Sequence, residues 1–153
     1  MRAEPDARRC WHDLRRNLFA ANARGHAKTS MTDLRIALET KLLAYAEDCG
    51  DTSRWRIARN LVARLPAETV VAPVQVLTEH YRVLTGKLKW TATKAKAAVQ
   101  SWGDAFQVAD STWSGMQAAL ELATDHRLQI WDAFIMSVAA LSMRLRPSAY
   151  EVC

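Results

Sequence analysis

Three acidic residues have types and positions that suit phosphodiester chemistry. Glu39 follows a short apolar segment, Glu79 lies on a stretch with helical periodicity, and Asp132 interrupts the apolar run "QIWDAFIMSVAAL". If the three converge, their carboxylates repel one another, and a hard divalent cation is the usual reason to hold such groups together. Mg²⁺ bound by acids and water can activate a water molecule and neutralise charge on a phosphodiester. The three acids therefore predict a metal-dependent hydrolytic site.

Each acid also has a purely structural explanation, which stays open at this point. Asp132, near the start of a helix, can interact with the helix macrodipole, a contribution of about 0.3–1 kcal/mol. Glu79 can be a solvated helix residue, and Glu39 an ordinary acid at a strand end. The spacing of His80 and His126 suits no metal site, so we expect both at the surface or in an interface. The Gly-rich nucleotide-binding, esterase and zinc-protease motifs do not occur in the sequence.

Short apolar segments alternate with helical patterns, and these elements must position the acids. We expect strands over residues 36–38, 69–72 and 106–108, and helices from residue 41, over 53–65, from Pro73 to about Gly86, over 91–102, around 116–123 and from residue 129 or 130 onward. Strands that alternate with helices imply an α/β fold with a mostly parallel sheet and helices on both faces. Glu39 then falls at the carboxyl end of the first strand, where such sheets bind ligands.

Apolar stripes indicate which helix faces are buried. The predicted stripes are Trp55, Ala58, Leu61, Val62 and Leu65; then Val74, Leu77, Tyr81 and Leu84; then Ala95, Ala98, Val99 and Trp102; and finally Met116, Ala119, Leu120 and Ala123. Gly86 is expected just past the end of its helix, where glycine often adopts a positive φ. The arginines of helix 53–65 lie mostly off its stripe, which favours a solvated face over an RNA groove.

The net charge of +5 is concentrated at one end of the chain. Residues 1–30 hold seven Arg or Lys against three Asp or Glu, so they carry +4 and the remainder carries +1. Any nucleic-acid contact must therefore come from local patches. No apolar run approaches the roughly 20 residues that span a bilayer. The three cysteines are far apart and form no CxxC pair, which favours a reducing, cytoplasmic location without a zinc site.

Three blocks of the sequence resemble the PIN-domain nucleases, and among these the VapC-type toxins. The blocks are "IALETKLLAYAED", "VVAPVQVLTEHYRVLTGKL" and "ALELATDHRLQIWDAFIMSVAA", and the likeness covers about Leu34 to Ala140. The resemblance implies a three-layer α/β/α fold with a mostly parallel central sheet. It also implies an Mg²⁺- or Mn²⁺-dependent endoribonuclease with an RNA substrate, a homodimer, and a cognate antitoxin protein that neutralises it, with no membrane partner.

The site residues of this family map onto the chain one by one. The first acid, in an Asp-Thr-Asn motif, corresponds to Glu39, with Thr40 retained and Lys41 in the Asn position. The helix Glu corresponds to Glu79, and the Asp of the Trp/Tyr-Asp-Ala-Leu block corresponds to Asp132. The resemblance thus implies these three acids as catalytic residues and metal ligands. The residues that we expect to contact RNA are Thr40, Arg82 and Lys87.

Two features depart from the family pattern. Glu39 is one methylene longer than Asp, and Lys41 places a cation beside the expected metal. The family also continues past its last helix into another strand with a further Asp, for which Glu151 is the candidate here. We therefore expect a PIN-like domain over 31–140 that is truncated at its C-terminal strand. An atypical tail over 141–153 follows it, and a basic leader over 1–30, disordered or extraneous, precedes it.

These departures leave two hypotheses beside a toxin-like ribonuclease. One is a catalytically inactive PIN-like remnant that only binds a partner or RNA. The other is an unrelated α/β module whose acids are structural. Titration with Mg²⁺ or Mn²⁺ separates the ribonuclease from both.

Overall fold

The structure, a computed structural model, describes residues 36–48 and 52–142. Its elements are β1 (Ile36–Ala37), α2 (Thr40–Glu47), α3 (Thr52–Arg64), a 3₁₀ turn (Ala67–Thr69), β2 (Val70–Pro73), α4 (Val74–Gly86), α5 (Ala92–Ala105), β3 (Gln107–Ala109), α6 (Trp113–His126) and α7 (Ile130–Ser142). Apart from the 3₁₀ turn, which takes Thr69 out of the expected second strand, their order and type are those expected from the sequence. The basic leader, Glu151 and most of the tail lie outside the described residues, so the proposed domain boundaries stay predictions.

β1, β2 and β3 form a parallel sheet with β2 in the centre. β1 pairs with β2 through Ile36 and Val70, and β2 pairs with β3 through Ala72 and Val108. All four residues of β2 are buried, as expected for a parallel strand that is covered on both faces. Pro73 ends the strand, where its missing N–H costs least, and serves as the N-cap residue of α4.

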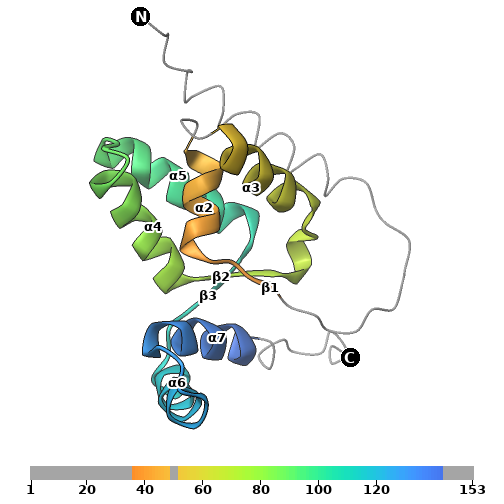
Figure 1. Ribbon diagram of the computed structural model, residues 1–153, viewed down its shortest axis with the longest axis vertical. Helices are drawn as coiled ribbons and strands as arrows, with labels where there is room; N and C mark the ends of the chain where they lie inside the picture. Colours follow the sequence, from red (N-terminus) through yellow and green to blue (C-terminus); the bar gives the residue numbers. More distant parts are fainter. Residues whose placement is uncertain (1–35, 49–51, 143–153) are drawn as a thin grey trace, which may run out of the picture.

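Helices cover both faces of the sheet (Figure 1). α2, α3, α4 and α5 lie on one side of the strands, and α6 and α7 lie on the other. α7 contacts all three strands, and α6 packs on α7. This is the three-layer α/β/α arrangement that the sequence predicted. Across residues 36–48 and 52–142, the helices are all too short or too polar to cross a membrane.

The two faces of β2 contribute to two different apolar clusters. Val70 and Ala72 belong to the larger one, whose other buried members are Leu38, Leu43, Ala46, Ala58, Val62, Val76, Leu77, Trp102 and Phe106. Val71 belongs to a smaller cluster with Ala109 and Val138, against which Phe134 packs. Because side chains of a strand alternate between its faces, β2 joins both helical layers into one core. The sheet is thereby fixed between α4 on one face and α7 on the other.

Three of the predicted helix stripes are wrong at one position each. Leu61, Tyr81 and Leu120 are 47%, 38% and 49% exposed. His80, which we expected at the surface or in an interface, is completely buried. The reason for the error on α4 is that this helix packs against both α2 and α5. Its buried face is therefore wider than one stripe and takes in His80 while leaving Tyr81 outside.

The predicted end of α4 near Gly86 is confirmed, but the predicted position of this glycine just past the helix is wrong. Gly86 is the last residue of the helix itself, and the helix is closed by a hydrogen bond of 2.9 Å from the N–H of Lys87 to the carbonyl of Val83. No glycine in the described part of the chain has a positive φ; Lys89 and Arg127 have one instead, at 55° and 54°. The chain therefore turns after α4 at Lys89, three residues later than the glycine signal suggested.

Candidate functional site

A different element positions each of the three acids. Glu39 is the N-cap residue of α2, directly after β1, and its side chain makes no capping hydrogen bond. Glu79 lies in the middle of α4, and Asp132 lies in the first turn of α7. The N–H of Leu38 donates to the carbonyl of Val71 at 3.0 Å, which fixes the start of α2 against β2. The carboxylate of Glu39 is thus held at the end of the sheet but left available for other contacts.

All three acids line one cleft, the acidic cleft, of about 420 Å³. The other lining residues are Thr40, Lys41, Ala44, Tyr45, Asp48, Val83, Lys87, Leu88, Trp131 and Ile135. The structure therefore brings together acids from α2, α4 and α7 that are far apart in the sequence. It also places two of the three expected RNA contacts, Thr40 and Lys87, in the same lining. The roles of these residues stay predictions.

Neighbouring side chains engage two of the three carboxylates. The hydroxyl of Thr40, which is buried, donates a hydrogen bond of 3.0 Å to Oε2 of Glu79. Nη2 of Arg82 lies 3.8 Å from the other oxygen, Oε1, of Glu79. Nζ of Lys41 lies 3.3 Å from Oε1 of Glu39. Lys41 and Glu39, the two residues that depart from the family pattern, thus contact each other.

Asp132 differs from the other two acids. It is exposed, and the described part of the chain offers its carboxylate neither a hydrogen bond nor an ion pair. Its place in the first turn of α7 also allows the favourable interaction with the helix macrodipole. As placed, no three His, Cys, Asp or Glu side chains within residues 36–48 and 52–142 form a ready metal site. Two of the acids would have to turn away from Lys41 and Arg82 to bind one cation together.

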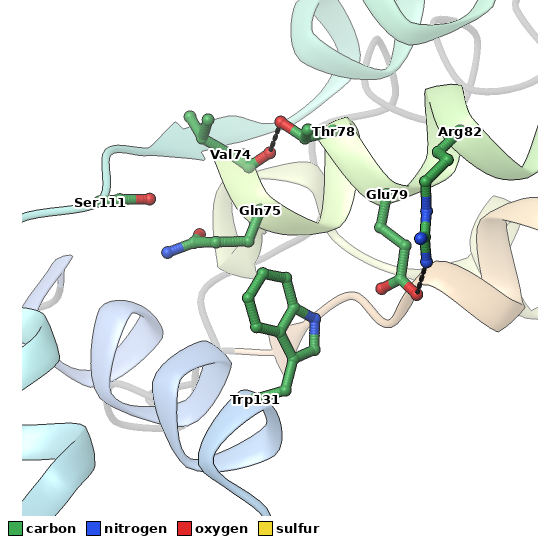
Figure 2. Close-up of a pocket in the computed structure, with 7 residues that line it drawn as sticks. All are labelled: Val74, Gln75, Thr78, Glu79, Arg82, Ser111 and Trp131. Carbon is green, nitrogen blue, oxygen red and sulfur yellow. Dashed lines mark hydrogen bonds and ion pairs between the residues drawn. The ribbon is translucent and has the colours of Figure 1, made fainter.

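A second cleft of about 560 Å³, the side cleft, is shown in Figure 2. Its lining residues are Val74, Gln75, Thr78, Glu79, Arg82, Ser111 and Trp131. Glu79 and Trp131 line both clefts, so the two spaces meet at these side chains. Sequence reasoning missed Gln75 and Trp131 as site residues. The available signals were a lone amide in the apolar stretch "VVAPVQVL" and an aromatic residue next to Asp132.

A buried polar group joins α2 to α5 on the same side of the sheet. Nε1 of Trp102 donates a hydrogen bond of 2.9 Å to Oε1 of Glu47. Burial raises the pKa of Glu47 to about 7 and lowers the pKa of His80 to about 4. The ring of His80 meets that of Trp102 edge to face, with centroids 6.4 Å apart. These groups lie outside the linings of both clefts.

Comparison with known families agrees with the fold. The sequence pattern of the PIN domain matches residues 36–143, which is most of the chain and includes Glu39, Glu79 and Asp132. Comparison with curated proteins gave no significant match. The family match rejects the hypothesis of an unrelated α/β module. The chain belongs to the PIN domain family, whose members are generally nucleases.

Proposed function

We propose that this chain is an endoribonuclease that hydrolyses RNA phosphodiesters in the cytoplasm with Mg²⁺ or Mn²⁺ as cofactor. One observation carries the proposal: acids from three separate elements line the same cleft. Carboxylates that share a cleft repel each other, so a fold that used them only for solubility or helix capping would gain by spreading them. Convergence of this kind is expected where a cation or a phosphate-handling reaction needs them.

The donor set of the acidic cleft suits a hard divalent cation. Carboxylate oxygens are the ligands that Mg²⁺ prefers, and Glu39, Glu79 and Asp132 would hold it. The side chains of Lys41 and Arg82 are 77% and 82% exposed. Ion pairs as exposed as these contribute only about 0–1 kcal/mol each, so the carboxylates can turn at little cost. A bound Mg²⁺ would neutralise charge on the scissile phosphate and favour ionisation of a water molecule.

The protein's own side chains bind the RNA and move the proton. Thr40 is a positioning residue, because its buried hydroxyl orients the carboxylate of Glu79. Lys87 at the acidic cleft and Arg82 at the side cleft are exposed cations that can bind backbone phosphates. Asp132, which is exposed, is the acid available to take a proton from the attacking water.

A binding module without catalysis is the second candidate function. The observation that favours it is the contact of 3.3 Å between Lys41 and Glu39. An ammonium group beside a ligand carboxylate competes with a metal ion for that carboxylate and repels the ion. If this competition prevails, the cleft can still bind RNA or a protein partner through its cations.

We further propose that the protein is the toxin of a toxin–antitoxin pair and forms a homodimer. The three VapC-like sequence blocks support this role. The layer of α6 and α7 also exposes large apolar side chains: Leu120, Ile130 and Met136 are 49%, 43% and 53% exposed. Exposed apolar residues of this size suit a protein interface, with a second copy or with a cognate antitoxin.

Isothermal titration with Mn²⁺ tests the metal-dependent function. The parent chain should bind Mn²⁺, and Asp132→Asn should abolish binding while the circular dichroism spectrum stays unchanged. Asp125→Asn is the matched control, because Asp125 is exposed at the end of α6 and lies outside both clefts. A parent that binds no Mn²⁺ would leave only the binding module. A joint loss of fold and binding in Asp132→Asn would favour the macrodipole explanation.

A further inference from the structure

Gln75 carries a buried amide that finds no partner in the described protein. The residue is 7% exposed, and neither Nε2 nor Oε1 has a hydrogen-bond partner there. Burying an amide without a partner costs free energy, so each such group calls for an explanation, and a ligand is one. The indole N–H of Trp55 and the ring nitrogens of His80 are also unpartnered. However, only Gln75 among these residues lines one of the two clefts.

The side cleft around this amide has one aromatic wall. Figure 2 shows the side chain of Gln75 extending from α4 toward Ser111, with the indole of Trp131 opposite it. The Glu79–Arg82 pair lies at the other end of the same cleft. Trp131 is 49% exposed, so a ligand in the cleft can reach its indole. The cleft therefore combines a flat apolar surface, a hydrogen-bonding amide and a cation.

A nucleotide of single-stranded RNA matches these three features together. Base stacking on an exposed indole is a common source of affinity for single strands. A glutamine amide offers one donor side and one acceptor side, which match the adjacent acceptor N7 and donor N6 of adenine, the base that glutamine reads in DNA. Arg82 offers a guanidinium to the phosphate of the same nucleotide. A purely apolar protein segment would leave the amide of Gln75 without a partner.

We propose that the side cleft binds the base next to the scissile phosphate, with Trp131 stacking on the base and Gln75 hydrogen bonding to its edge. The inference rests on the proposed ribonuclease function and adds a base preference to it, with adenine favoured. The shared walls set the position: Glu79 and Trp131 line both clefts. A base in the side cleft therefore places its own phosphate beside Glu79, at the entrance to the acidic cleft.

Binding of short, labelled single-stranded RNA to the full chain tests the subsite. Fluorescence anisotropy is measured in EDTA, so that the RNA stays intact, with oligonucleotides of A, C or U. Trp131→Ala should weaken binding about tenfold, or about 1.4 kcal/mol, for every sequence. The matched control is Trp113→Ala, since Trp113 is 71% exposed on α6 and lines neither cleft. This control should bind like the parent.

Gln75→Met separates recognition from folding. The change keeps the size of the side chain but removes the buried polar atoms. It should raise the melting temperature, because an unsatisfied amide is lost, and should also remove the preference for oligo(A). If Gln75 has only a structural role, Gln75→Met should raise the melting temperature but leave the base preference unchanged. Gln117→Met, at an exposed position of α6, should change neither quantity.

The outcomes test the base-binding subsite and the ribonuclease function separately. If the parent cleaves RNA but Trp131→Ala and Gln75→Met keep parental affinity and base preference, the subsite is wrong and the ribonuclease stands. If Trp131→Ala loses affinity and Gln75→Met loses the preference for oligo(A), but the parent never cleaves RNA with Mn²⁺, the subsite stands and the catalytic proposal fails. A parent with no measurable affinity for any of the oligonucleotides would overturn the subsite and leave the side cleft to a protein partner.

Discussion

Lys41 is the residue whose replacement reports most directly on the acidic cleft. Its ammonium lies 3.3 Å from the carboxylate of Glu39, and the two side chains are 77% and 63% exposed. The informative variant combines Lys41→Asn with Glu39→Asp. It removes the competing cation and restores the shorter acid that is usual in the family. We expect this double variant to bind Mg²⁺ and Mn²⁺ more tightly than the parent.

The expected gain follows from two small electrostatic contributions. Breaking the exposed pair between Lys41 and Glu39 costs the parent about 0–1 kcal/mol before metal can bind. Repulsion between the ammonium and a bound cation adds about 1 kcal/mol at the effective dielectric constant of water. The shorter Asp also has one rotor fewer to order. Together these contributions correspond to about tenfold tighter binding, or about 1.4 kcal/mol.

Isothermal titration at one fixed ionic strength measures the difference, because salt screens exposed charges. Lys96→Asn is the matched control: Lys96 is exposed on α5, carries the same charge and lies outside both clefts. The control should bind metal like the parent. Unchanged affinity in the double variant would mean that Glu39 is not a ligand. An equal gain in the control would assign the effect to net charge alone.

Three further predictions concern stability and assembly. Thr40→Val removes the hydrogen bond to Glu79 and should lower the free energy of unfolding by about 1 kcal/mol in urea titrations; an unchanged value would remove Thr40 as a positioning residue. Burial raises the pKa of Glu47 from 4.5 to about 7, so its contribution to stability is full below pH 4.5 and is lost as the pH rises through 7. Burial lowers the pKa of His80 from 6.5 to about 4, so its contribution is full above pH 6.5 and is lost as the pH falls through 4. Between pH 4.5 and 6.5 the two groups change the free energy of unfolding in opposite directions as the pH rises. Glu47→Gln removes one of them, so the free energy of unfolding of this variant should rise with pH by up to about 1.4 kcal/mol per pH unit. A flat pH profile of this variant would contradict the prediction. In sedimentation at micromolar concentration, the parent should have twice the mass of one chain. The variant Met136→Glu should have the mass of a single chain. A monomeric parent would reject the homodimer.

The features that could be predicted from sequence are those that depend on local pattern. β2 follows from the run "VVAP", which is apolar at every position and ends in proline. The buried residues Ala95, Ala98 and Trp102 follow from their spacing on one helical stripe. β2 is covered on both faces and is therefore apolar throughout, whereas α5 buries one stripe, so in each case the pattern within the element is enough.

The features that could not be predicted depend on how elements pack. α4 is covered by α2 and α5 together, so His80 is buried although the periodicity placed it off the stripe. The side cleft is lined by Gln75 of α4 and Trp131 of α7, which are distant in the sequence. The bond between Glu47 and Trp102 likewise joins helices that are distant in the chain. Periodicity within one helix carries no information about such pairs.

The three acids lie between these two cases. Their positions at a strand end, on a helix and in a first turn could be predicted from the sequence. That they would share one cleft was inferred from the elements on which they lie, and the family resemblance supported this inference by implying that all three acids belong to one site. The contact of Lys41 with Glu39 was foreseeable from the same resemblance, which showed both residues to be unusual.

Cleavage of a single-stranded RNA by the full chain is the most direct test of the central claim. With Mn²⁺ the parent should produce discrete fragments, EDTA should stop the reaction, and excess Mn²⁺ should restore it. Asp132→Asn should not cleave, whereas the matched Asp125→Asn should cleave like the parent. Fragments that still form in EDTA, or that Asp132→Asn produces as fast as the parent, would contradict a metal-dependent reaction in the acidic cleft.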